Sequence, residues 1–131
     1  MREIKIKVRG YHCDAFGHVN NARYLEFLEE ARWSLFDPEG TSLPPVGLVV
    51  ARIAIDYRRP SLLGEELAVR TALARLGAKS ATLAQVIVRD KDTVAQAEVV
   101  MVAVDASGRA APMEGVIKEA LLGLLGEPLE K

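Results

Sequence analysis

One stretch of helical periodicity lies between strand-like segments, and this order restricts the possible folds more than any other feature of the chain. Residues 3–9 alternate between apolar and charged side chains, which is typical of a half-buried strand. In residues 21–36 the apolar side chains instead recur at helical spacing. Strand-like runs follow at 46–57, 66–76, 79–89 and 93–104, and residues 114–125 return to helical spacing. The sequence therefore predicts a strand, a long helix, four strands and a short helix.

The short connections between the later runs predict how the strands pair. Strands that follow one another through short turns pair antiparallel. We therefore expect an α+β fold, in which the long helix packs on one face of a five-stranded antiparallel sheet. The run 46–57 is nearly all apolar at its start, which favours a central strand. In the long helix, Tyr24, Phe27 and Leu28 are expected to face the core, and Arg32 is expected at one of the polar positions between the apolar ones.

Length and charge exclude several classes of protein. The 131 residues fit one domain, so we expect a single domain over residues 1–131. Lys plus Arg is 17 and Asp plus Glu is 18, a net charge of -1, which excludes the broad cationic surface of a nucleic-acid-binding protein. The chain has no membrane-length apolar run and no signal-peptide pattern, so we expect a cytoplasmic protein with no membrane partner. It contains one cysteine, Cys13, and lacks the Cys/His spacings of zinc sites.

The stretch 11–32 contains most of the residues that could carry chemistry. It holds both histidines, the cysteine, an aspartate and two adjacent asparagines, namely His12, Cys13, Asp14, His18, Asn20 and Asn21. They stand just before the predicted start of the long helix, where free backbone N–H groups and a partial positive charge favour an anion or a developing oxyanion. The residues alone are equally compatible with a strand-to-helix turn that has structural asparagine caps.

Spacing within this stretch leaves further alternatives open. His12 and Asp14 are two residues apart, so on a strand they would share one face, and His12 could tune Asp14 or order a water molecule. Cys13 would point to the opposite face, which argues against a Cys–His nucleophile pair. His12, Asp14 and His18 could also form a metal site of two histidines and one carboxylate.

Residues 14–29 resemble the signature of the hotdog-fold 4-hydroxybenzoyl-CoA thioesterase family, which reads D-x-x-G-H-V-N-N-x-x-Y-L-x-x-x-E. Within that family, residues 7–12 and 20–33 are similar to the bacterial long-chain acyl-CoA thioesterase III group. Residues 55–60, IDYRRP, match the family's second motif. The resemblance implies a hotdog fold, in which the sheet wraps around a long central helix. It also implies hydrolysis of acyl-CoA, a site between the protomers of a homodimer or homotetramer, and no metal or other cofactor.

The resemblance also assigns roles to individual residues. The family's catalytic carboxylate corresponds to Asp14, as general base or as nucleophile, and its carbonyl-polarising backbone amide corresponds to Asn21. His12 stands where many members have a second acidic residue, so the resemblance does not support a mechanism with two carboxylates. His18 and Asn20 could hold water or the thioester carbonyl.

Coenzyme A requires cations for its phosphates, and two groups of residues could provide them. Arg75, Lys79 and Ser80 flank the 76–78 turn, where family members contact the nucleotide or the pantetheine. Arg59 belongs to a second basic pair, at a strand end. Side chains of this kind are more often simply solvated at the surface, and that alternative stays open.

The acyl group and the reaction are less strongly determined. Leu25, Phe27, Leu28 and Trp33 lie on or near the long helix and suggest an apolar slot for a medium or long acyl chain. Two other functions on the same fold remain open at this point. One is a non-catalytic acyl-CoA binding module, and the other is an acyl-carrier-protein thioesterase.

Overall fold

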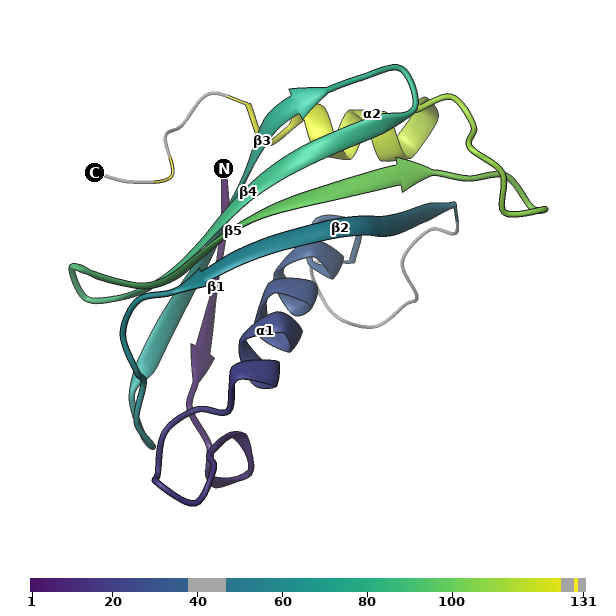
Figure 1. Ribbon diagram of the computed structural model, residues 1–131. Helices are drawn as coiled ribbons and strands as arrows, with labels where there is room; N and C mark the ends of the chain where they lie inside the picture. Colours follow the sequence, from purple (N-terminus) through teal and green to yellow (C-terminus); the bar gives the residue numbers. More distant parts are fainter. Residues whose placement is uncertain (38–46, 126–128, 130–131) are drawn as a thin grey trace.

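The structure of the protein, a computed structural model, describes residues 1–37, 47–125 and 129. Over these residues the α-helices and strands follow one another in the predicted order, with one additional 3-10 turn (Figure 1). The elements are β1 (Arg2–Lys7), the 3-10 helix η1 (Gly10–His12), α1 (Asn21–Trp33), β2 (Leu48–Tyr57), β3 (Glu66–Leu76), β4 (Ser80–Arg89), β5 (Asp92–Ala103) and α2 (Gly115–Leu122). No helix in the described part of the chain is long and apolar enough to cross a membrane.

The strands form one antiparallel sheet in the order β1-β3-β4-β5-β2. The predicted five-stranded antiparallel sheet is therefore confirmed. The predicted central position of β2 is wrong, because β2 is an edge strand that pairs with β5. Most side chains of β2 are exposed, including Val49 and Val50. The apolar start of β2, which suggested a central strand, is thus exposed at Val49 and Val50, whereas Ile53 and Ile55 are half-buried against the core.

Helix α1 lies against one face of the sheet, which twists around it (Figure 1). Leu67 and Val69 alternate along β3 and are completely buried on that face. From α1, Phe27 and Leu28 join them in the same core cluster, as the helical spacing predicts. Burial of each side chain of this size contributes about 1.5–3 kcal/mol to stability. A long helix held in an antiparallel sheet is the arrangement expected of a hotdog fold.

One charged residue, Arg32, also lies on the buried side of α1, so its predicted place among the outward polar residues is wrong. It follows Leu28 by four residues and therefore shares that residue's face of the helix. Its Nη1 donates a hydrogen bond to Oε1 of Gln85 on β4 over 3.0 Å. The Gln85 amide in turn donates to the Leu28 carbonyl over 3.1 Å and to Oγ1 of Thr71 over 2.9 Å. This buried network joins the last turn of α1 to β3 and β4.

Both helices are shorter than the sequence predicts. Helix α1 ends at Trp33 rather than at residue 36, because the next residues tighten into 3-10-like turns. In these turns the Leu35 N–H donates to the Arg32 carbonyl and the Phe36 N–H donates to the Trp33 carbonyl. Helix α2 covers the middle of the predicted 114–125 segment. Residue 46, where the third predicted element begins, lies outside the described residues.

Candidate active site

Residues 8–20 connect β1 to α1 through two tight turns in place of the extended segment that the spacing argument assumed. The first is the 3-10 turn Gly10–His12, after which Cys13 pairs with Val19 in an isolated antiparallel bridge. Inside that bridge the Asp14 N–H donates to the His18 carbonyl over 2.8 Å. Gly17 completes the turn with a φ of 79°, a left-handed conformation that glycine adopts without strain. The shared strand face expected for His12 and Asp14 is therefore not formed.

The Asp14 side chain is exposed and is held in place by its own turn. Its Oδ1 accepts hydrogen bonds from the backbone N–H of Phe16 over 2.9 Å and of His18 over 3.3 Å. Such bonds from a side chain to nearby backbone amides stabilise a turn and fix the direction of the carboxylate. Because both amides donate to Oδ1, Oδ2 is the oxygen that can be presented to a ligand.

The start of α1 provides the second feature of the site. The side chain of Asn20 is the N-cap and accepts from the Ala22 N–H over 2.9 Å. The Asn20 carbonyl accepts from the Arg23 N–H over 2.8 Å. The first N–H groups of a helix have no acceptor within the helix. In α1 the Asn20 side chain and carbonyl accept from the second and third of these groups, those of Ala22 and Arg23. The Asn21 N–H is therefore left at the positive end of α1, where it can stabilise a negatively charged oxygen.

A hollow of about 260 Å³ brings Asp14, His18, Asn21 and Arg59 together. Four of the predicted site residues thus lie around one space, although they come from the turn, the helix start and the segment after β2. The same hollow is lined by Tyr24 and by residues 57–60. The Tyr57 hydroxyl donates to the Asn21 carbonyl over 3.3 Å, which places that side chain directly beside the helix start. The sequence interpretation missed the two tyrosines, although Tyr57 stands inside the quoted IDYRRP motif.

The side chains of His12 and Asn20 have other contacts. Nδ1 of His12 accepts from the Arg9 N–H over 2.9 Å, and its ring packs edge-to-face on Phe27 with centroids 4.9 Å apart. Burial, followed by the positive charge of Arg23, lowers the pKa of His12 below its ordinary value of 6.5. The ring is therefore neutral at pH 7, as an accepting Nδ1 requires. Neither residue lines the hollow that holds Asp14, and their catalytic roles stay predictions.

The remaining predicted CoA-binding residues lie at the other end of the sheet. Arg75 and Ser80 bound the turn between β3 and β4, and the Arg75 guanidinium donates to Thr82 over 3.4 Å. The Asp14 end of the chain adjoins the beginning of β3, since Glu66 pairs with Lys7 at the end of β1. Ten residues of strand separate the two ends, on the order of 30 Å. One chain therefore does not bring Lys79 and its neighbours to Asp14.

The apolar slot expected from Leu25, Phe27, Leu28 and Trp33 is not formed by these four side chains together. Phe27 and Leu28 are 3% and 1% exposed and belong to the core, so they are not available to a ligand. Leu25 and Trp33 are exposed on α1. Helical spacing identified the core face correctly, but the same residues cannot also line a slot.

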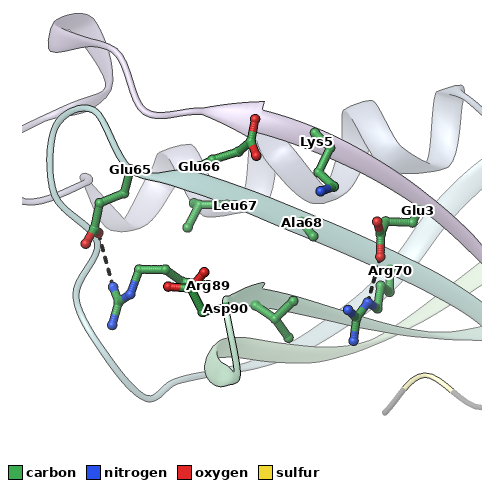
Figure 2. Close-up of a pocket in the computed structure, with 10 residues that line it drawn as sticks. Glu3, Lys5, Glu65, Glu66, Leu67, Ala68, Arg70, Arg89 and Asp90 are labelled. Carbon is green, nitrogen blue, oxygen red and sulfur yellow. Dashed lines mark hydrogen bonds and ion pairs between the residues drawn. The ribbon is translucent and has the colours of Figure 1, made fainter. Parts of the chain in front are cut away.

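A different hollow, of about 300 Å³, lies on the sheet face opposite α1 (Figure 2). Charged side chains of β1, β3 and the end of β4 line it. Oε1 of Glu3 accepts from Nε of Arg70 over 2.8 Å, and Oε1 of Glu65 accepts from Nη1 of Arg89 over 3.1 Å. These two ion pairs occupy part of the hollow, and none of the predicted site residues lines it.

Metal-binding side chains do not gather at either hollow. Among the described residues, no three His, Cys, Asp or Glu side chains are grouped so that they could hold a metal ion. The His12 ring packs on Phe27 and does not line the hollow that Asp14 and His18 line. Catalysis without a metal stays a prediction.

Comparison with known proteins identifies the family. Residues 8–121 match the thioesterase-like superfamily, and this range contains every residue of the candidate site. The chain belongs to that superfamily. The predicted resemblance is therefore confirmed at the level of the family.

Three relatives illustrate the relation of this thioesterase-like chain to known proteins. The long-chain acyl-CoA thioesterase FadM of Escherichia coli is 41% identical over 126 residues, which are 91% of this chain and 96% of FadM. The acyl-CoA thioester hydrolase YbgC of Escherichia coli is 31% identical over 106 residues, 75% of this chain and 79% of YbgC. A solved thioesterase of Thermus thermophilus, complexed with coenzyme A and Zn, is 34% identical with a TM-score of 0.83. That comparison covers 97% of this chain and 96% of the solved one.

Proposed function

We propose that this protein is an acyl-CoA thioesterase that cleaves long-chain acyl-CoA to a free acid and CoA. The observation that carries the proposal is the hollow in which a turn-held aspartate carboxylate faces the same space as the uncapped first amide of a helix. Membership of the thioesterase-like superfamily supports the reaction. The 41% identity to a protein named for long-chain acyl-CoA supports the substrate class.

The chemistry follows from the two parts of the hollow. With the thioester carbonyl oxygen at the Asn21 N–H, the amide and the helix dipole stabilise the charge of the tetrahedral intermediate. As a general base, Asp14 takes a proton from the water that attacks the carbonyl carbon, the C–S bond breaks, and the CoA thiolate leaves and takes up that proton. As a nucleophile, Asp14 Oδ2 displaces the thiolate to give a mixed anhydride, which water cleaves to the acid and the free carboxylate. A thiol with a pKa of about 8.5 leaves without a strong general acid.

The proposal includes a site between two chains, with a homodimer as the smallest active unit and a homotetramer as its further assembly. Strand β2 is an edge strand whose exposed side chains include Val49, Val50 and Tyr57, and such an edge is suited to pairing with another strand. A two-fold axis beside β2 would pair it antiparallel with its copy. The partner would then be reversed, so that its β3–β4 turn with Lys79 would approach the Asp14 end of this chain.

A cytoplasmic location is also part of the proposal. A chain with one cysteine has no intramolecular disulfide, which is usual for proteins of a reducing compartment.

The test measures CoA release with a thiol reagent from acetyl-, decanoyl-, palmitoyl- and benzoyl-CoA. We expect kcat/KM to increase with the length of the fatty acyl chain, because each buried methylene contributes about 0.8 kcal/mol until its slot is full. Benzoyl-CoA should be a poor substrate, since a short aryl group buries less apolar surface than a long alkyl chain. If kcat/KM stays constant or falls from decanoyl- to palmitoyl-CoA while benzoyl-CoA is turned over fast, the long-chain assignment is rejected.

Three further measurements test the alternative functions and the absence of a catalytic metal. Acyl-CoA binding without thiol release would indicate a binding module. Faster release from an acylated acyl carrier protein than from the matching CoA ester would indicate an acyl-carrier-protein thioesterase. Dialysis against EDTA should leave the rate unchanged, and a rate that is lost and then restored by Zn²⁺ would contradict catalysis without a metal.

A further inference from the structure

Arg32 is an unusual cation, because it is 5% exposed and yet forms no ion pair with an acidic side chain in the described part of the chain. Among the described residues, no carboxylate oxygen lies within 4.0 Å of its guanidinium. Burial of an arginine without a counter-charge is costly, and a structure that retains one needs a reason. The burial also lowers the pKa of Arg32, and the nearby negative charge of Glu29 opposes that shift.

Arg32 uses little of its hydrogen-bonding capacity within residues 1–37, 47–125 and 129. A guanidinium carries five N–H donors, and with these residues the Arg32 guanidinium makes one hydrogen bond, from Nη1 to Gln85. In the described part of the chain, the fully buried polar side-chain atoms without a hydrogen-bond partner are Tyr24 Oη and Ser61 Oγ. The remaining Arg32 nitrogens are not among them, so they are not fully buried. The unused donors are therefore accessible, and the space beside them is a hollow of about 340 Å³ between α1 and β2.

Among the described residues that line this hollow, Arg32 and Glu29 are charged and the others are apolar. They come from the end of α1, the start of β2 and the neighbouring strand β5, and consist of Trp33, Phe36, Leu48, Val49, Val50 and Met101. Glu29, which is exposed, provides the acidic side chain of the lining. The volume lies at the lower end of the range typical of small-molecule sites, about 300–1,000 Å³. A fixed cation in a hollow lined mainly by apolar side chains suits a ligand with an anionic head and an apolar body.

We propose that this hollow is a binding site for the carboxylate of a medium-chain fatty acid. The planar fork of Arg32 fits a carboxylate through two parallel hydrogen bonds, while the alkyl chain covers Trp33 and the β2 valines. The site is distinct from the Asp14 hollow, because Arg32 follows Asn21 by eleven residues, about 16 Å along α1. A fatty acid is also the product of the proposed thioesterase reaction. Regulation of the enzyme by its product would rest on that proposed function, whereas the binding site itself does not.

The chain carries its own reporter for the test. Trp33 is the only tryptophan, and it lies 51% exposed in the wall of the hollow. We expect sodium decanoate, below its micellar concentration, to change Trp33 fluorescence saturably. The matched alcohol 1-decanol should bind at least about tenfold more weakly, because it lacks the charge that pairs with Arg32. Equal binding of the acid and the alcohol would overturn the proposal.

Two charge variants locate the site without disturbing the buried network. Glu29→Gln removes the repelling charge beside the hollow and should tighten decanoate binding several-fold, roughly as expected for one nearby like charge. Glu30→Gln, an exposed neighbour on α1 that does not line the hollow, should leave the affinity unchanged.

A third variant, Arg32→Lys, changes the buried network itself and is therefore checked for folding by circular dichroism. It should weaken decanoate binding, because lysine lacks the planar fork of the guanidinium. Identical affinities of the wild type and Glu29→Gln would overturn the proposal, and because no turnover is measured, this outcome is independent of thioesterase activity.

Discussion

The two oxygens of the Asp14 carboxylate have different surroundings, and this difference allows a specific test of catalysis. Asp14→Asn retains an Oδ1 that can accept from the amides of Phe16 and His18, so the turn should stay intact. It removes the negative charge that either chemical role requires. We expect kcat to fall at least about a hundredfold, with little change in Tm.

The matched control for this variant is Asp90→Asn. Asp90 is exposed at the β4–β5 turn with a φ of 55°, a conformation that asparagine also tolerates. This control should retain full activity. Retained activity of Asp14→Asn would remove Asp14 from the mechanism, and a large loss of Tm would assign it to the turn alone.

His12 should make stability depend on pH. Its pKa is lowered in the folded chain, chiefly by burial, so the unfolded chain takes up a proton first as the pH falls below 6.5. The stabilisation is therefore complete above that pH and decreases toward the lowered pKa of the folded state. Tm measured from pH 8 to 5 should fall more steeply for the wild type than for His12→Asn, which retains an acceptor for the Arg9 N–H. Parallel curves over the whole range would show that His12 does not titrate in this way.

Part of the site could be predicted from the sequence. Asp14, His18 and Asn21 are close in the chain around a glycine turn and a helix start, so local signals suffice to bring them together. The expected strand face shared by His12 and Asp14 was wrong, because the chain forms a 3-10 turn at His12, and the catalytic role of His12 stays a prediction. Tyr57 could not be placed beside Asn21 from periodicity, since their contact depends on how a distant strand crosses the helix start.

At the scale of elements, the buried network of Arg32, Gln85 and Thr71 fixes the end of α1 on the sheet. Gln85→Leu keeps a side chain of similar size on β4 but removes the amide that bonds the Arg32 guanidinium and the Leu28 carbonyl. Unfolding in urea should show a loss of about 1–3 kcal/mol, the usual cost of unsatisfied buried polar groups. Gln96→Leu, on the outer face of β5, is the control and should change stability by about 0.5 kcal/mol or less. Equal effects of the two changes would mean that the network does not hold α1.

The order of the elements was predictable because the periods of strands and helices differ so clearly. Arg32 was misplaced although its spacing from Leu28 already put it on the core face, since charge was given more weight than position. The edge position of β2 was missed for another reason. Apolar residues predict burial, but they do not distinguish burial inside one chain from burial between two copies.

At the scale of the whole molecule, the proposed dimer depends on β2. Light scattering of the wild type should give a multiple of the 14.3 kDa chain mass. Val49→Lys places a charge on this edge, which discourages strand pairing, and should give a protein of monomer mass with little thioesterase activity. Val116→Lys makes the same change at an exposed position of α2 and should alter neither property. A fully active wild-type monomer would contradict a site shared between chains.

The strand order also determines how late the chain can fold during synthesis. Arg2 of β1 pairs with Thr71, and Leu48 of β2 pairs with Ala103, so both edge strands obtain their partners only after long intervening segments have been made. Closing such long loops costs entropy before any contact compensates for it, which slows folding. The apolar β2 consequently leaves the ribosome unpaired and stays so until β5 is complete. During that interval its apolar side chains are exposed, and the nascent chain requires protection from aggregation there.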